Sequence, residues 1–220
     1  MPRVIPSCAV ILFLAAGSPG AQSSDSPETL ARRLQLRYED IRDFRADFSQ
    51  RARSGLLPTQ STGAGTVAVK KPGRMRWEYT MPEKKEVIFD GTNIFEYLPD
   101  ERLVYKDAAP SGDRAPTAML FLSGRGDVLR DFVPSHVESP VAGTIALRLT
   151  PRQTERDYEY LVVAIDPRSL QIRALVTRDE FGGDSQITFS NLRENAGIPD
   201  RTFAFTPPRG VEVISSAGLR

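Results

Sequence analysis

Residues Arg74–Thr80 read RMRWEYT, and their alternation decides how this chain folds. Every second residue is apolar, namely Met75, Trp77 and Tyr79. The residues between them are charged, namely Arg74, Arg76 and Glu78. Because successive side chains of a strand point to opposite faces, this pattern predicts a β-strand with one apolar and one solvated face.

The same pattern continues outward in both directions, in short segments separated by Pro- and Gly-containing turns. The other predicted strands are Phe44–Ser49, Thr62–Lys70, Lys85–Phe89, Asn93–Leu98, Arg102–Lys106, Phe132–Ser139, Thr144–Thr150, Tyr158–Ile165, Gln171–Asp179 and Ser185–Leu192. Turns this short join antiparallel neighbours, since a parallel crossover takes a dozen or more residues. We therefore predict a mainly β (α+β) fold, with about eleven antiparallel strands in one curled sheet.

Helical cover for this sheet is sparse. Leu30, Leu34, Tyr38 and Ile41 recur at helical spacing and predict one amphipathic helix over Glu28–Asp40. Two further short helices are expected within Ala108–Asp131. So large an apolar face must pack against helices, a second sheet or a ligand. Either these helices complete an ordinary core, or they form a lid over a concave apolar face that binds a ligand.

The N-terminal segment reads as a secretory signal peptide. Arg3 precedes the apolar run Cys8–Gly17, which is about half the length of a membrane span, and small residues follow it. We expect cleavage near residue 21, within about 17–23, and one domain over 22–220. Cys8 is the only cysteine and stands at the beginning of the apolar run, so we expect neither a disulfide nor a lipid anchor.

Charge and residue types exclude several classes of protein. Without Arg3 the chain has 28 basic and 28 acidic residues, a balance that argues against nucleic-acid binding. His136 is the only histidine, too few for a typical zinc site, and no Gly-x-Ser-x-Gly motif is present. We therefore predict no catalytic residues, no metal and no cofactor. A basic cluster, made of Lys70, Lys71, Arg74 and Arg76, is either a solvated hairpin or a docking edge for an acidic partner.

Four stretches carry a resemblance to a known family. They are Phe44–Gln50 (FRADFSQ), Val69–Tyr79 (VKKPGRMRWEY), Ile88–Pro99 (IFDGTNIFEYLP) and Thr202–Val211 (TFAFTPPRGV). In these stretches, taken in order, the chain resembles the LolA family of periplasmic outer-membrane lipoprotein carriers. The resemblance implies an incomplete antiparallel barrel whose mouth is lidded by helices. It also implies a periplasmic monomer that carries triacylated lipoproteins from an inner-membrane ABC-type release complex to an outer-membrane receptor lipoprotein.

The resemblance and the strand pattern together predict the site. The expected cavity lining is Phe48, Met75, Trp77, Tyr79, Phe95, Tyr97, Met119, Leu120, Leu147, Leu149, Leu161, Val163, Ile187 and Phe189. By resemblance, Pro116–Ser123 forms a lid helix, and the basic cluster serves as a lid latch or partner contact. Lys71 stands where familiar members carry arginine, which keeps the charge and loses the planar set of donors.

Two other functions fit the same sheet. One is a related carrier of another acylated lipid or glycolipid, which the sequence does not distinguish from a lipoprotein carrier. The other is a periplasmic sensor or binding module similar to the RseB-like regulators, which usually carry a further C-terminal domain. Neither alternative needs reactive groups.

Overall fold

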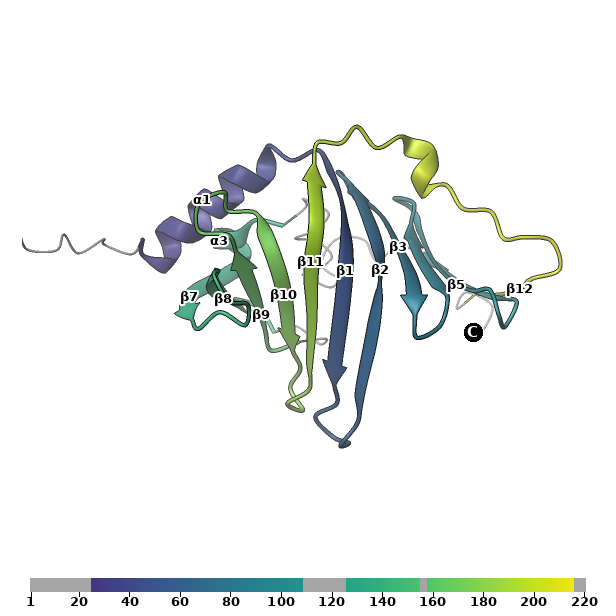
Figure 1. Cartoon of the computed structure of the whole chain (residues 1–220), viewed down its shortest axis with the longest axis horizontal. Coiled ribbons are helices and arrows are strands. Elements are labelled where there is room, and N and C mark those ends of the chain that lie inside the picture. Colours follow the sequence, from purple (N-terminus) through teal and green to yellow (C-terminus); the bar gives the residue numbers. More distant parts are fainter. Residues whose placement is uncertain (1–24, 109–125, 155–157, 216–220) are drawn as a thin grey trace, which may run out of the picture.

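The computed structural model describes residues 25–108, 126–154 and 158–215. These residues form one twelve-stranded sheet with an N-terminal helix (Figure 1). The helical elements are α1 (Pro27–Glu39), α3 (Val128–Asp131) and the short 3₁₀ helix η2 (Asp200–Phe203). The strands are β1 (Asp43–Arg53), β2 (Gln60–Lys70), β3 (Arg74–Met81), β4 (Lys85–Phe89), β5 (Asn93–Leu98), β6 (Leu103–Ala108), β7 (Phe132–Val137), β8 (Ile145–Pro151), β9 (Tyr160–Ile165), β10 (Ile172–Arg178), β11 (Asp184–Glu194) and β12 (Glu212–Ser215).

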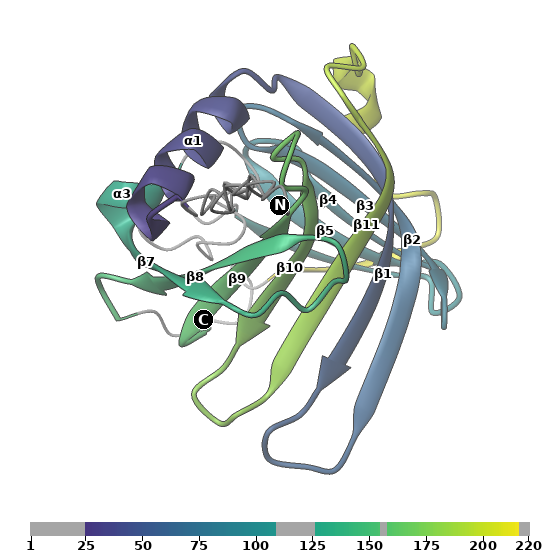
Figure 2. The same ribbon diagram turned by 60° about the vertical axis from the view of Figure 1, so that its left-hand side comes forward.

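The strand order across the sheet is β12-β6-β5-β4-β3-β2-β1-β11-β10-β9-β8-β7. The two edge strands, β12 and β7, are not neighbours in this order, so the sheet is a curled, open barrel (Figure 2). All neighbouring strands pair antiparallel except β12, which pairs parallel with β6. The predicted incomplete antiparallel barrel is confirmed, with one strand more than expected.

Helix α1 begins where its sequence favours a helix start. The Ser26 hydroxyl accepts the backbone N–H of Thr29 at 3.2 Å, Pro27 occupies the first turn and Glu28 lies near the positive end of the helix dipole. One stripe of the helix is buried, namely Leu30, Ala31, Leu34 and Tyr38. This stripe packs in the main apolar cluster with side chains from one face of the sheet. We call this sheet face, on the α1 side of the curl, the concave face (Figure 2).

The opposite, convex face is covered in part by the chain that follows β11. This segment, residues 195–211, crosses back through η2 to β12, and we call it the strap (Figure 1). A second apolar cluster lies under the strap, where Phe205 and Val211 pack against Ile88, Phe95 and Val104. The rings of Phe95 and Phe205 lie 5.2 Å apart. The β4–β6 part of the sheet is therefore apolar on its convex side too.

Two residues that the resemblance assigned to the cavity, Phe95 and Tyr97, lie on the other face of the sheet. Residues directly opposite each other on neighbouring strands share a face. Phe95 pairs with Ile88, which pairs with Arg76, so Phe95 lies on the face opposite that of Trp77. Tyr97 is on the same convex face, with its ring 5.6 Å from that of Phe205. The expectation that these two line the cavity is wrong, because the strap gives their strand an apolar convex neighbour.

The predicted helices lie partly within and partly outside the described residues. The first predicted helix, Glu28–Asp40, corresponds to α1, and α3 is a short helix within the predicted helical region. The predicted lid helix Pro116–Ser123, the lining residues Met119 and Leu120 and the signal segment 1–21 lie outside the described residues.

Candidate functional site

The concave face brings together residues from strands far apart in the sequence. Ten of the predicted lining residues lie in its apolar cluster, either buried or packed against it: Phe48, Met75, Trp77, Tyr79, Leu147, Leu149, Leu161, Val163, Ile187 and Phe189. Strand register explains the grouping, since Phe48 faces Phe189 across β1–β11 and Leu147 faces Val163 across β8–β9. The face is thus apolar from β3 to β8.

An aromatic cluster occupies the centre of this face. The Phe48 ring meets Trp77 edge-on at 5.0 Å and Tyr79 edge-on at 4.9 Å. Gly65 lies between Phe48 and Tyr79 in the strand register, and its lack of a side chain allows rings two strands apart to meet. A Cβ at Gly65 would lie 1.9 Å from the Glu78 carbonyl oxygen, so the backbone itself requires glycine there. Each aromatic pair contributes about 0.5–1.5 kcal/mol beyond its buried area.

Polar groups border the aromatic cluster. The Tyr79 hydroxyl donates to Gln50 Oε1 at 2.9 Å, and the Gln50 amide donates to Ser185 Oγ at 3.1 Å. Lys85 lies 4.9 Å from the Tyr79 ring centre and pairs with Glu96 at 3.2 Å. Burial, assisted by the negative charge of Glu96, raises the pKa of Tyr79, so its hydroxyl remains a neutral donor.

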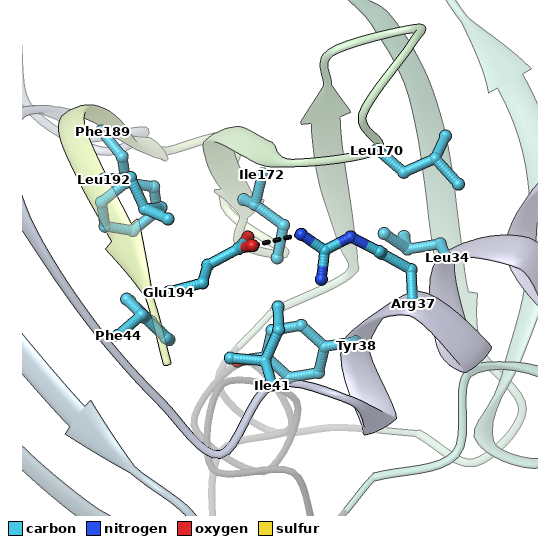
Figure 3. Close-up of a pocket in the computed structure, with 10 residues that line it drawn as sticks. All are labelled: Leu34, Arg37, Tyr38, Ile41, Phe44, Leu170, Ile172, Phe189, Leu192 and Glu194. Atoms are coloured by element: carbon cyan, nitrogen blue, oxygen red, sulfur yellow. Dashed lines mark hydrogen bonds and ion pairs between the residues drawn. The ribbon is translucent and has the colours of Figure 1, made fainter. Parts of the chain in front are cut away.

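Helix α1 fills the concave face at the β8–β11 side. Leu30, Leu34 and Tyr38 are each no more than 5% exposed. A cavity of about 10 Å³ lies beneath the helix, which is room for about one water molecule. Figure 3 shows its lining, which includes Leu34, Ile172 and Phe189. The helix therefore occupies this part of the face closely, and a ligand there must displace α1 side chains.

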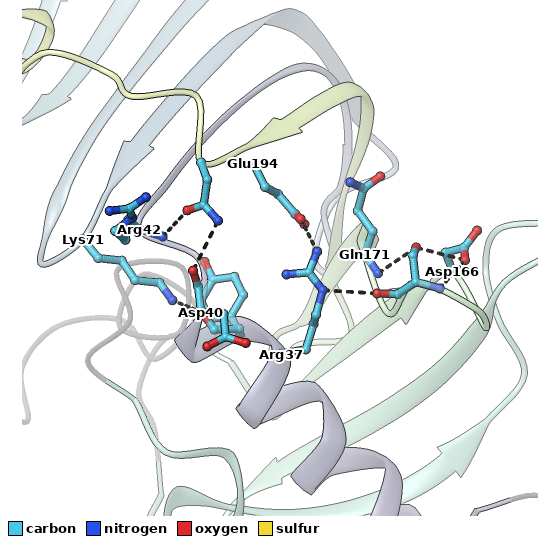
Figure 4. A network of polar contacts seen from close by, with 10 residues as sticks. Arg37, Asp40, Arg42, Lys71, Asp166, Gln171 and Glu194 are labelled. Atoms are coloured by element: carbon cyan, nitrogen blue, oxygen red, sulfur yellow. Dashed lines mark hydrogen bonds and ion pairs between the residues drawn. The ribbon is translucent and has the colours of Figure 1, made fainter.

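Several contacts hold the C-terminal end of α1 (Figure 4). Lys71 Nζ donates to the Tyr38 carbonyl oxygen and lies 3.7 Å from the centre of the Tyr38 ring. A cation at this end of a helix also complements the helix dipole. On the other side, the Arg37 guanidinium pairs with Glu194 and donates to the Ser169 carbonyl oxygen at 3.3 Å. The Asn195 amide donates to the Asp40 carbonyl oxygen at 3.3 Å.

Burial of the Lys71 ammonium opposes these favourable contacts. Burial lowers the pKa of Lys71 from 10.5 to about 8, while the nearby Glu39 and Asp40 act in the opposite direction. A lowered pKa in the folded state means that the unfolded state binds more protons between pH 8 and 10.5. Raising the pH through this window therefore increases the stability of the folded state, in which Lys71 contacts α1.

The rest of the basic cluster faces the strap. Lys70 and Arg74 pair with Asp200 at 2.6 and 2.8 Å, and these hydrogen bonds lower the pKa of the Asp200 carboxyl. Arg76 pairs with Glu86 at 2.5 Å and donates to the Thr202 carbonyl oxygen at 3.2 Å. These three cations therefore pair with carboxylates of their own chain, Asp200 and Glu86, and not only with solvent. Lys71 contacts α1 instead, so the cluster divides between α1 and the strap.

Sequence reasoning missed the Arg37–Glu194 pair. These residues come from α1 and from the end of β11, and no local pattern links them. It also singled out His136, whose side chain is exposed, with its Nε2 atom 2.9 Å from the Asp25 carbonyl oxygen. Within the described ranges, no three His, Cys, Asp or Glu side chains gather as metal ligands would. The helices in the same part of the chain are too short or too polar to cross a bilayer.

Comparison with known proteins gives a consistent result. The sequence profile described as "Outer membrane lipoprotein carrier protein LolA" matches residues 39–206. An outer-membrane lipoprotein carrier protein from Dechloromonas aromatica is 31% identical over 179 residues, which is 80% of this chain and 83% of that protein. A protein of the same name from Ralstonia nicotianae is 29% identical over 210 residues, 93% of each chain.

Among solved structures, an uncharacterized conserved protein from Thermus thermophilus has a similar fold. It has a TM-score of 0.53 at 12% identity, and the match covers 84% of this chain and 98% of that one. Four sequence stretches in order, an open curled sheet with an N-terminal helix on its concave face, and a profile match across most of the chain all agree. The chain belongs to the LolA family of outer membrane lipoprotein carrier proteins.

Proposed function

We propose that this protein binds the acyl chains of outer-membrane lipoproteins on its concave face and carries them through the periplasm. The observation that carries the proposal is the apolar concave face, which runs from β3 to β8 and is covered at one side by the apolar stripe of α1. The names of its relatives, outer-membrane lipoprotein carrier proteins, support lipoproteins as the cargo.

The proposed route begins at an inner-membrane ABC-type release complex and ends at an outer-membrane receptor lipoprotein. The signal-like segment 1–21 supports export, with cleavage near residue 21 and a periplasmic location. Its task there is physical, because burying an acyl chain is worth about 0.8 kcal/mol per methylene and a triacylated protein cannot cross water unaided. Binding and release require no bond to be made or broken.

The proposed mechanism is exchange between α1 and cargo. Leu30, Leu34 and Tyr38 bury against the same sheet face that acyl chains would occupy. Opening α1 exposes this surface and cargo covers it again, so the apolar area buried changes little between the two states. Handover then follows the relative affinities of carrier, release complex and receptor. The Lys71 and Arg37 contacts set how readily the lid opens.

An extraction assay tests the proposal. The mature protein is incubated with inner-membrane vesicles that hold newly made lipoproteins, and the released material is identified by mass spectrometry. The proposal predicts a soluble complex of carrier with acylated lipoprotein. Release of no acylated ligand would contradict it.

A matched pair of variants tests the face. Trp77→Glu replaces a half-buried aromatic residue of the concave face by a charged one. Tyr97→Glu makes the same kind of change at a half-buried aromatic residue of the convex face. Trp77→Glu should lose extraction and Tyr97→Glu should keep it, with both proteins folded by circular dichroism. Equal extraction by the two variants would contradict the proposal that cargo binds on the concave face.

A further inference from the structure

Two hairpin loops meet at one end of the sheet. The β1–β2 loop follows Arg53 and the β10–β11 loop precedes Asp184, and these two residues pair across β1–β11. Figure 1 shows both loops at the lower end of the sheet, at the end opposite the β11–strap connection. Their backbones touch, because a Cβ on Gly55 would lie 2.0 Å from the Phe181 carbonyl oxygen. Gly55 therefore allows the two loops to form one unit.

Internal hydrogen bonds fix the shape of both loops. Ser54 Oγ accepts the backbone N–H groups of Leu56 and Leu57 at 3.3 and 3.2 Å. In the other loop, the Asp179 carboxylate accepts the N–H groups of Phe181 and Gly183 at 2.9 and 2.7 Å. These four hydrogen bonds lie within the loops, and the turns that they shape carry large apolar side chains.

These apolar side chains face water. Leu56 is 72% exposed, Leu57 61% and Phe181 57%, which is unusual for three neighbouring large apolar residues. We name Leu56, Leu57 and Phe181 the tip platform. It comes from two different hairpins that contact each other, so it is a composite surface and not one irregular loop.

The charges behind the tip platform cancel. The flanking residues include Arg51, Arg53 and Arg178 and, with opposite charge, Asp179, Glu180 and Asp184. Asp184 is paired with Arg53 at 2.5 Å and with Arg178 at 3.8 Å. The platform therefore has neither strong attraction to nor strong repulsion from an anionic surface.

We propose that the tip platform inserts its three apolar side chains into the interface of a lipid bilayer. Its size argues for lipid as the occupant. A stable protein–protein interface needs about 800 Å² and roughly 20–30 residues from each partner, far more than three side chains on a protruding turn supply. A bilayer interface accepts single apolar side chains, each of which contributes by its own buried area. Contact there would be reversible and would set a carrier transiently against a membrane.

Vesicle flotation tests this inference with cargo-free mature protein. The probes are vesicles of phosphatidylcholine alone and vesicles with about one third phosphatidylglycerol. Wild-type protein should float with both, with partition coefficients that agree within about twofold because the platform has no net charge. The triple variant L56Q/L57Q/F181Q should lose at least about tenfold in partition coefficient.

The matched control is Leu36→Gln. Leu36 is 59% exposed on α1, between Phe181 and Leu57 in exposure, and lies outside the platform. This control should float like wild type. A direct measure of insertion is Phe181→Trp, whose added emission should shift to shorter wavelength with vesicles and be quenched by lipids with brominated chains.

Two outcomes would overturn the inference. One is equal flotation of the triple variant and the Leu36→Gln control, with no quenching of Phe181→Trp. The other is concentration-dependent dimerisation of wild type, abolished by the triple variant, without flotation, which would assign the platform to a second copy of the chain. Because the assay contains no lipoprotein, its result is independent of whether the concave face binds cargo.

Discussion

Substitution of Leu34 by alanine separates a lid that competes with cargo from a helix that merely completes a core. Leu34 is 1% exposed and lies in the buried stripe of α1 against the concave face. Removal of a buried leucine side chain costs about 2–5 kcal/mol, because apolar burial is lost and a cavity remains. This side chain belongs to the α1 contact, so opening α1 becomes easier by up to the same amount.

The expected change in affinity follows from the same energy. If the open state is the binding-competent one, apparent affinity rises in proportion to the open fraction. With about 1.4 kcal/mol for each factor of ten, the lower value of about 2 kcal/mol corresponds to roughly 30-fold tighter binding. The variant should thus be less stable and bind cargo more tightly, a combination that a plain core substitution would not produce.

Two measurements check this prediction. Urea denaturation gives the free energy of unfolding, and fluorescence titration with a triacylated lipopeptide gives the affinity. Leu36→Ala is the control, since Leu36 is 59% exposed on the same helix and should change neither quantity. Reduced stability of Leu34→Ala with unchanged lipopeptide affinity would refute the competition between α1 and cargo.

Two further predictions concern the latch and the convex face. Because the folded pKa of Lys71 is about 8 and its ordinary value 10.5, wild-type stability relative to Lys71→Met should rise between these pH values. The slope should stay below about 1.4 kcal/mol per pH unit, since solvent screens this half-exposed group. The Lys71→Arg variant, compared with Lys71→Met in the same way, should show no such rise. If urea denaturation gives a difference between wild type and Lys71→Met that does not change with pH, the predicted rise in stability is contradicted. Phe95→Ala, at a side chain 5% exposed under the strap, should cost about 3–5 kcal/mol of unfolding free energy and leave lipopeptide affinity unchanged. If Phe95→Ala loses lipopeptide affinity in proportion to its loss of stability, Phe95 belongs to the cargo site.

The sequence pattern predicts the fold well where one face of a strand is solvated. In β3, charged residues alternate with Met75, Trp77 and Tyr79, so the alternation itself identifies the concave face. The pattern fails in β5, where the neighbours Ile94 and Phe95 are both apolar. Ile94 packs toward the main cluster and Phe95 toward the strap, and only the tertiary path of the strap explains why both faces are apolar.

Long-range contacts account for the rest of what the sequence did not reveal. Strand β12 has four residues, too few to show a period, and it pairs parallel with β6 only because the strap carries it across the convex face. The Arg37–Glu194 pair joins residues 157 positions apart. Lys71 was predicted as part of the basic cluster, but its contact with the Tyr38 carbonyl oxygen joins residues 33 positions apart, which no local pattern reveals.

Photo-crosslinking tests the central claim, that acyl chains bind on the concave face, most directly. A photoreactive phenylalanine analogue is placed at Trp77, in the aromatic cluster of the concave face, or at Phe95, under the strap on the convex face. After loading with lipoprotein and irradiation, mass spectrometry locates the linked carbon atoms. The account predicts crosslinks from position 77 to acyl chains and none from position 95. Acyl crosslinks from position 95 alone would contradict it.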